Sequence, residues 1–228
     1  MKLVSILGDS VSTYLGYNPE GYAVYYDEEM RLQNGLNSVN DTWWVQVIQA
    51  LNARLCVNGS YSGSQVTGNI FPAALSDERI ADLRTSDAVP NVILVYIGFN
   101  DFGRGIKASD KGLKRILYHD GRNFANDYMK MLAKIKRAYP KALIVCGTLM
   151  RTEIRGRPSW RFPEMFAGTR FEDYNTAIRR ACKRKNCRLA DLNALGAQYE
   201  TLDGSPPTAK GHKTIADAWI KCFGERII

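Results

Sequence analysis

The feature that most constrains the fold of this chain is a nearly continuous apolar run over residues 92–97. A strand with one face in water alternates apolar and polar residues, whereas a parallel strand covered on both faces is apolar throughout. The run therefore predicts a central strand of a parallel sheet. Four other short segments have the composition of strands: residues 3–7, 54–58, 142–146 and 187–192.

Helices are predicted between these strands, over residues 41–51, 73–84, 123–139 and 171–185. A last helix carries Ile215, Ala218, Trp219 and Cys222 on one face. Strands that alternate with helices form βαβ units with right-handed crossovers. The predicted fold class is therefore α/β, a three-layer α/β/α sandwich around a five-stranded parallel sheet.

The composition is that of a soluble globular protein, with 228 residues, 45% of them apolar and 24% charged. This length suits one domain over residues 1–228. The first apolar segment meets Asp9 too early for a signal peptide or a membrane span, so a cytoplasmic location without a membrane partner is expected. The five scattered cysteines include no Cys-x-x-Cys pair, which favours reduced thiols and no metal site.

The formal net charge of +8 raises the question of a nucleic-acid partner. The densest basic run lies within residues 179–188, near the end of a predicted helix. Cations at a helix carboxyl end interact favourably with the helix dipole and project into water. Because no nucleic-acid-binding motif accompanies the run, we interpret it as a solvated face and expect no nucleic-acid partner.

The carboxyl ends of parallel strands meet at one edge of a sheet, where ligands bind in open α/β folds. Ser10, Gly63 and Asn100 follow the first three predicted strands, and Asp203 precedes the last helix. Acyl transfer needs a nucleophilic oxygen, donors aimed at the oxyanion and a base held by a carboxylate. Ser10 could supply the oxygen, although an ordinary turn at the end of a strand also uses Gly, Asp and Ser.

These segments resemble the motifs of the GDSL or SGNH hydrolases, a family of serine esterases and lipases with a flavodoxin-like fold. The resemblance implies Ser10 as the nucleophile, an oxyanion hole from Ser10, Gly63 and Asn100, a catalytic role for Asp203, and no cofactor. It covers nearly the whole chain in the family's order. The matching blocks are Gly8-Asp9-Ser10, Ser62-Gly63, residues 98–101, and Asp203 with residues 207–212.

The chain departs from the family at the general base. The family's last block is Asp-x-x-His, but three residues after Asp203 this chain has Pro206, which has no proton to exchange. His212 is the tentative substitute, and His119, in a predicted loop, is a second one. If neither acts, the chain is a catalytically impaired ligand-binding protein with the fold of these hydrolases.

Three long loops are predicted over residues 14–40, 102–122 and 148–169. Loops of this length in a compact domain are usually functional or ordered by their own side chains. Arginine and aromatic side chains in the third loop suit a carboxylate, a phosphate or a sugar ring, although an exposed basic loop explains them equally well. The candidate substrate contacts are Asp9, Arg151 and Trp160, and the expected substrate is a small acyl ester, with an acetylated sugar preferred.

Two other classes of protein are less compatible with the sequence. A phosphate-binding or nucleotide-binding module of this fold would use the same sheet edge, but the chain has no Gly-x-x-x-x-Gly-Lys-Ser/Thr and no Gly-x-Gly-x-x-Gly motif. A metal hydrolase would need clustered ligands, whereas the two histidines are distant in the sequence. A serine ester hydrolase is therefore the function that the sequence favours.

Overall fold

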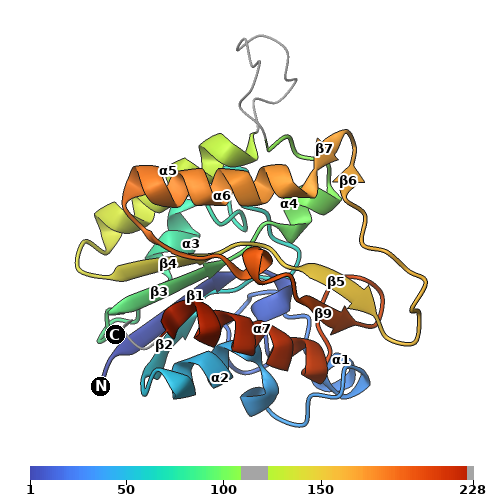
Figure 1. Ribbon diagram of the computed structural model, residues 1–228. Helices are drawn as coiled ribbons and strands as arrows, with labels where there is room; N and C mark the ends of the chain where they lie inside the picture. Colours follow the sequence, from blue (N-terminus) through green and yellow to red (C-terminus); the bar gives the residue numbers. More distant parts are fainter. Residues whose placement is uncertain (109–122, 225–228) are drawn as a thin grey trace.

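A five-stranded parallel sheet forms the centre of the protein, whose computed structural model describes residues 1–108 and 123–224 (Figure 1). The strands are β1 (Leu3–Gly8), β2 (Arg54–Asn58), β3 (Val92–Tyr96), β4 (Leu143–Gly147) and β8 (Arg188–Ala190). Their order across the sheet is β2-β1-β3-β4-β8, which is the flavodoxin-like order. The predicted fold class is confirmed.

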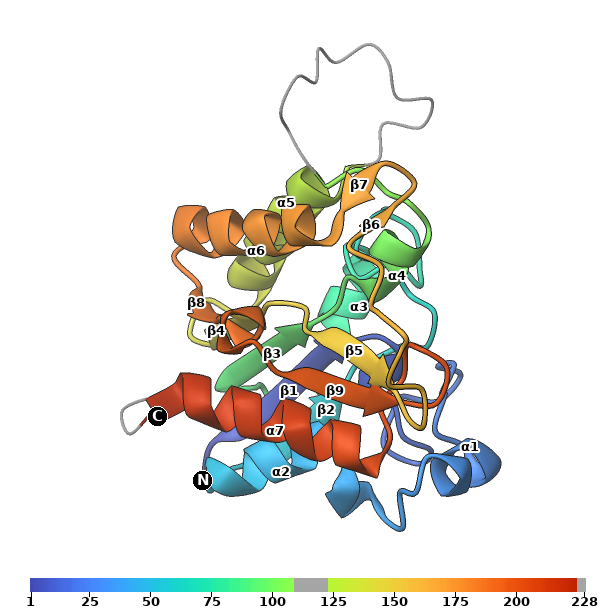
Figure 2. The same ribbon diagram turned by 45° about the vertical axis from the view of Figure 1, so that its right-hand side comes forward.

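Helices cover both faces of this sheet (Figures 1 and 2). One layer consists of α2 (Trp43–Ala50) and α7 (Ala209–Phe223), which pack against each other. The other consists of α3 (Asp77–Ala81), α5 (Phe124–Ala138) and α6 (Phe171–Lys185), with α5 in contact with both of its neighbours. The three layers of the predicted sandwich are therefore present.

The core lies between the sheet and the helix layer of α2 and α7 on one side and beneath α5 and α6 on the other. Every residue of β3 is buried, as its apolar run predicts. On the α2 and α7 side, the rings of Trp43 and Trp219 stack with centroids 5.3 Å apart, and Tyr96 meets both edge-on. Gly147 lies against this aromatic group. A side chain has no room there, because a Cβ would come within 2.6 Å of the Trp219 ring.

Several predicted boundaries match the structure closely. The segments of β2 and α6 agree residue for residue, and α5 begins after Asn123, whose side chain accepts a hydrogen bond from the Asn126 amide at 3.1 Å. The helix predicted over residues 73–84 is shorter in the structure, where it spans only Asp77–Ala81. There Ser76 caps the helix, and residues 73–76 form turns before it.

The long segments predicted as loops contain additional elements. The first holds the short helix α1 (Glu28–Gln33), and the turn after β3 is the short helix α4 (Phe99–Gly103). The third contains β5 (Arg151–Ile154) and the hairpin of β6 (Met165–Phe166) and β7 (Thr169–Arg170). β5 pairs in parallel with β9 (Gln198–Thr201). Short 3₁₀ helices span Ser10–Ser12, Val39–Asp41 and Leu192–Leu195.

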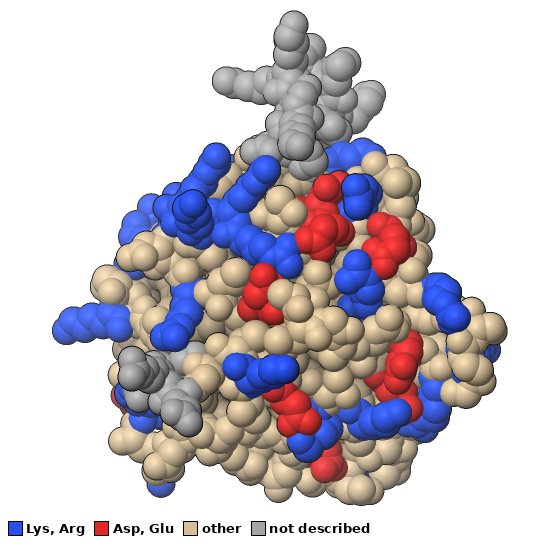
Figure 3. All heavy atoms as spheres, in the orientation of Figure 1, with Lys and Arg blue, Asp and Glu red and all other residues tan. Residues whose placement is uncertain are grey.

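Lysine and arginine side chains gather over α6, with acidic side chains beside them (Figure 3). Arg179 of this helix forms ion pairs with Glu172 and, at 2.8 Å, with Asp191. All five cysteines are free thiols. No helix in residues 1–108 or 123–224 is both long and apolar enough to cross a membrane.

The amino-terminal turn of α7 offers a test of this packing. At Gly211 a Cβ would collide with the Glu200 carbonyl oxygen and lie 2.8 Å from the Pro207 side chain, so Gly211→Ala should lower the free energy of unfolding by about 2 kcal/mol. Gly103→Ala is the control, because a Cβ there would meet nothing within 4 Å. Urea unfolding measures both, and an equal effect of the two substitutions would contradict the packing at α7.

Candidate active site

The turn after β1 places Ser10 at the carboxyl edge of the sheet. Asp9 caps the 3₁₀ helix that follows, and its Oδ1 accepts a hydrogen bond from the Val11 amide at 3.1 Å. Ser10 retains 9% exposure. The Thr13 hydroxyl donates a hydrogen bond to the Ser10 carbonyl oxygen at 3.2 Å. The Ser10 hydroxyl itself has no hydrogen-bond partner among the described residues.

Contacts from neighbouring elements fix the conformation of this turn. The Asn58 amide group donates to the Ser12 carbonyl oxygen at 2.7 Å, and the Trp43 indole donates to the Ser12 hydroxyl at 3.1 Å. Gly8 has no room for a side chain, since a Cβ would lie 2.7 Å from Ser12 Oγ and 2.8 Å from Ser60 Oγ. The glycine of the Gly-Asp-Ser motif is therefore required by close packing against the turn that follows β2.

Arg79 of α3 is fully buried directly behind this turn. Its Nη2 donates to the carbonyl oxygens of Gly8 at 3.0 Å and Gly59 at 2.9 Å, and its guanidinium lies over the rings of Tyr22 and Tyr61. Burial lowers the pKa of Arg79 to about 10, which leaves the group charged at neutral pH. The sequence does not reveal this residue, because a lone arginine in a short helix gives no signal of burial.

The predicted oxyanion-hole residues lie in the turns after β2 and β3. Asn100 is in the first turn of α4, and its side-chain amide donates to the Ser64 carbonyl oxygen at 2.9 Å. One N–H of that amide is therefore directed toward the loop after β2. Gly63 has a φ of 77°, and Gly98, before Asn100, has a φ of 141°, so both positions favour glycine.

A cavity of about 470 Å³ brings several of the predicted residues together at this edge. Asn100, Asp203 and Trp160, which come from three distant segments, all line it. Its remaining walls include three phenylalanines, and Trp160 lies over Gly204, where a Cβ would be 3.8 Å from the indole. The lining residues fall within 99–104, 160–163 and 203–205.

The position of the family's base is occupied by a buried proline in the loop between β9 and α7. Pro206 is buried, and the carbonyl oxygen of Pro207 accepts a hydrogen bond from the Tyr26 hydroxyl at 2.6 Å. Asp203 is exposed, and its Oδ1 accepts from the Ser205 amide at 3.3 Å. The loop thus keeps the carboxylate accessible to the cavity while residue 206 offers no titratable group.

His212 lies in the first turns of α7 and is completely buried. Its Nδ1 accepts a hydrogen bond from the Trp43 amide at 3.1 Å, its ring packs beside Tyr26, and its Nε2 has no partner within the described residues. Burial lowers the pKa of His212 to about 3. These contacts join α7 to α2 and argue for a structural role. His119 lies outside the described residues.

Two buried carboxyl groups lie beneath the candidate site. Burial raises the pKa of Asp9 to about 7 against the opposing effect of the Val11 and Gly98 amides, and raises that of Asp101 to about 6. Asp101 accepts hydrogen bonds from the amides of Val66 at 2.8 Å and Thr67 at 3.1 Å, so it ties α4 to the loop after β2. These two hydrogen bonds hold the helix turn of Asn100 and the loop of Gly63 together.

The three candidate substrate contacts lie in different environments. Trp160 is half-buried and lines the cavity. Asp9 is only 1% exposed. Arg151 pairs with Glu164 at 2.6 Å and donates to Asn193 at 2.8 Å, which engages its guanidinium in contacts within the protein. The cavity therefore includes Trp160 but not the other two residues.

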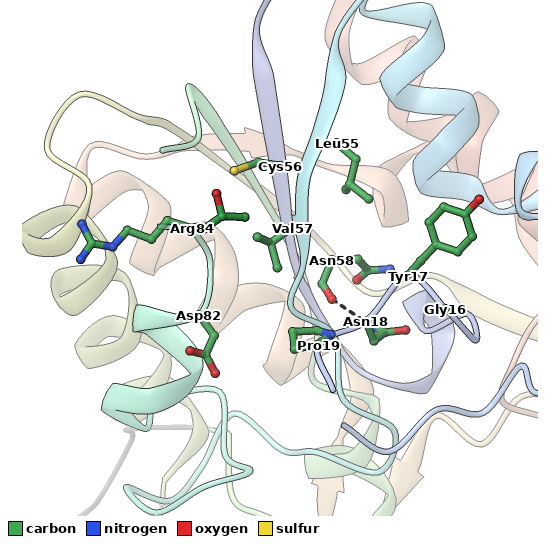
Figure 4. A pocket seen from close by; sticks show the side chains of 11 residues that line it. Gly16, Tyr17, Asn18, Pro19, Leu55, Cys56, Val57, Asn58, Asp82 and Arg84 are labelled. Atoms are coloured by element: carbon green, nitrogen blue, oxygen red, sulfur yellow. Dashed lines mark hydrogen bonds between the residues drawn. The ribbon is translucent and has the colours of Figure 1, made fainter. Parts of the chain in front are cut away.

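A second cavity, of about 420 Å³, lies along the outer edge of β2 (Figure 4). Cys56 and Val57 of the strand and Arg84 line it, and the Asn18 amide closes one end by donating to the Asn58 carbonyl oxygen at 3.0 Å. None of the candidate catalytic residues lines this cavity. Across residues 1–108 and 123–224, no three His, Cys, Asp or Glu side chains form a group that could hold a metal ion.

A flavodoxin-like sheet with a serine at the end of β1, glycine and asparagine after the two neighbouring strands, and a carboxylate before the last helix is the layout typical of the GDSL hydrolases. The profile of the GDSL-like Lipase/Acylhydrolase family matches residues 2–160. The chain belongs to this family. No curated protein matches the chain.

Solved structures agree with this assignment. A protein described as a GDSL-like lipase from Bacteroides ovatus is 26% identical, with a TM-score of 0.65 over 98% of this chain and 97% of that one. A second, from Bacteroides uniformis, is also 26% identical, with a TM-score of 0.67 over 95% and 92%. A mutant of an acetyl-xylooligosaccharide esterase from Geobacillus, 16% identical, shares the fold with a TM-score of 0.62 over 100% and 96%.

The buried Asp9 gives the stability a defined pH dependence. Because its pKa is about 7 in the folded state and about 4 in the unfolded state, folding retains a proton between these values, and the free energy of unfolding falls as the pH rises. Asp9→Asn should remove up to about 1.4 kcal/mol per pH unit of this decline. Urea unfolding between about pH 4 and pH 7 measures it.

His212 contributes the opposite slope, because its folded pKa lies below its unfolded value and the unfolded state takes up the proton first on acidification. His212→Gln should therefore make stability decline more steeply with rising pH between about 3 and about 6.5.

For the Asp9 prediction, parallel pH profiles of the free energy of unfolding for the wild type and Asp9→Asn would contradict the burial of Asp9.

Proposed function

We propose that this GDSL-family hydrolase is a serine acylesterase that cleaves a small acyl ester through Ser10. The observation that carries the proposal is that Asn100 and Asp203, from distant segments, line the same cavity of about 470 Å³. Ser10 does not line this cavity, but it follows β1, which pairs with β3, the strand that leads to Asn100. A nucleophile, an amide donor and a carboxylate at one sheet edge are the groups that acyl transfer needs.

In the proposed reaction, Ser10 Oγ attacks the ester carbonyl carbon, and its proton leaves for the solvent or the Asp203 carboxylate. The amides of Ser10 and Gly63 and the side chain of Asn100 stabilise the negative oxygen of the tetrahedral intermediate. Collapse releases the alcohol with a proton and leaves an acyl group on Ser10, which water then hydrolyses to the carboxylic acid. Because the proton acceptor is not an imidazole, this turnover is expected to be slow.

The preferred substrate is an acetylated sugar. Trp160 and Phe162 offer half-buried flat faces to the cavity, and amphipathic rings of this kind suit the apolar face of a sugar. The acetyl-xylooligosaccharide esterase with the same fold lends support from a distant relative. A cavity of about 470 Å³ accommodates a ligand of the size of a small acylated sugar.

The second candidate function is ligand binding without turnover. It is favoured by the buried Pro206 at the base position and by His212, whose Nδ1 accepts from the Trp43 amide at 3.1 Å. Loss of the base in a serine triad costs several orders of magnitude in rate. Activation of the Ser10 hydroxyl therefore distinguishes the two functions.

Covalent labelling with a fluorophosphonate tests the esterase. We expect slow labelling of the wild type and slow hydrolysis of 4-nitrophenyl acetate, and loss of both in Ser10→Ala, because the reagent requires an activated hydroxyl. Ser12→Ala is the matched control, since the Ser12 hydroxyl is bonded to the Trp43 indole. Intact protein mass spectrometry records the label. A wild type that is neither labelled nor active would leave ligand binding as the function, and unchanged turnover in Ser10→Ala would exclude Ser10 as the nucleophile.

Restoring the family's base is a separate test. We expect Pro206→His to raise the rate of 4-nitrophenyl acetate hydrolysis by roughly 100-fold, because a positioned general base contributes at least this factor. The gain should vanish in the double variant with Ser10→Ala. A folded Pro206→His protein with no gain, together with a large loss in folded His212→Gln, would identify His212 as the working base.

A further inference from the structure

Arg104 lies at the end of α4 and lines two cavities of the candidate site. It belongs to the wall of the 470 Å³ cavity and to that of a neighbouring one of about 400 Å³ that includes Gly63 and Ser64. Its Nη1 donates to the Gly63 carbonyl oxygen at 2.9 Å. One hydrogen bond thus anchors the guanidinium between the turns that follow β2 and β3.

No acidic side chain among the described residues neutralises the charge of Arg104. Two other arginines of this region have acidic partners: Arg151 pairs with Glu164 at 2.6 Å and Arg155 with Glu200 at 3.1 Å. Arg104 is exposed and forms no ion pair with any residue of the ranges 1–108 and 123–224. Asp203 lines the same cavity but does not pair with it. The remaining N–H groups of the guanidinium are therefore available to a ligand.

The wall beside Arg104 is aromatic. Phe102 and Phe162 stack with ring centroids 5.9 Å apart, and Trp160 meets Phe162 edge-on at 6.3 Å. Phe102 is buried, which holds the half-buried Phe162 in place, while Trp160 closes the side toward Gly204. A guanidinium fork beside flat apolar faces suits a ring that carries a carboxylate.

We propose that the cavity binds an acidic sugar ring, with Arg104 pairing with its carboxylate and Trp160 and Phe162 contacting its apolar face. This inference rests on the proposed function, whose substrate it narrows from an acylated sugar to an acylated acidic sugar. Arg104 is then the specificity-determining residue that separates acidic from neutral sugars. The Ser10 chemistry is unaffected, because the carboxylate is distinct from the ester.

The matched pair of 4-nitrophenyl β-D-glucuronide and 4-nitrophenyl β-D-glucoside tests this proposal, since the two differ in whether a carboxylate is present. Neither has an acyl ester, so calorimetric titration of the wild type measures binding without turnover. We expect the glucuronide to bind about fivefold more tightly, as for a partly exposed ion pair, and the preference to weaken with added salt. Arg104→Gln should remove the preference.

Arg157→Gln is the matched control. Arg157 is an exposed arginine of the segment that carries Trp160, but it does not line the cavity, so the preference should remain. Equal binding of the two compounds, binding of neither, or a preference that survives Arg104→Gln would overturn the proposal. Because binding does not need an activated Ser10, the proposed esterase can fail in the labelling experiment while the acidic-sugar site stands, and the reverse also holds.

Discussion

The parallel pairing of β1 with β3, from Val4 opposite Val92 to Gly8 opposite Tyr96, is the constraint on which the candidate site depends. Because the two strands end at the same level, the turns that carry Ser10 and Asn100 leave the sheet side by side. β2 pairs with the other edge of β1 and brings the Gly63 turn to the same place. Three short motifs, distant in the sequence, are thus gathered by strand pairing, and contacts such as that of the Asn100 amide with the Ser64 carbonyl oxygen join the turns after β2 and β3.

Much of this arrangement could be predicted from the sequence, because buried parallel strands and amphipathic helices leave strong periodic patterns. The segments of β2 and α6 are examples. The pairing of β5 with β9 could not be predicted, since both strands are short and carry polar residues, and about 45 residues separate them. The roles of Arg79 and Arg104 were also hidden, because burial and cavity lining depend on which segments fold together.

The protein has the fold of the family but not a histidine at the position of the family's general base. His212 is held by the Trp43 amide, so the histidine that the sequence offered for catalysis connects two helices of the core. Pro206 is buried in a loop whose neighbouring carbonyl oxygen bonds to Tyr26. Because Pro206 has no titratable group and His212 is engaged with Trp43, we expect proton removal from Ser10 to limit the proposed chemistry.

The hydrogen bonds of the Arg79 guanidinium connect the end of β1, the turn after β2 and Pro72 through main-chain oxygens. Because those acceptors are present whatever side chain a position carries, these hydrogen bonds do not depend on the side chains of the loops, unlike the contacts of Arg79 with the Tyr22 and Tyr61 rings. Divergence at the rim can therefore alter which esters are recognised while the strand ends beneath stay in register. The same scaffold could in this way pass between hydrolysis and simple recognition during evolution without first becoming unstable.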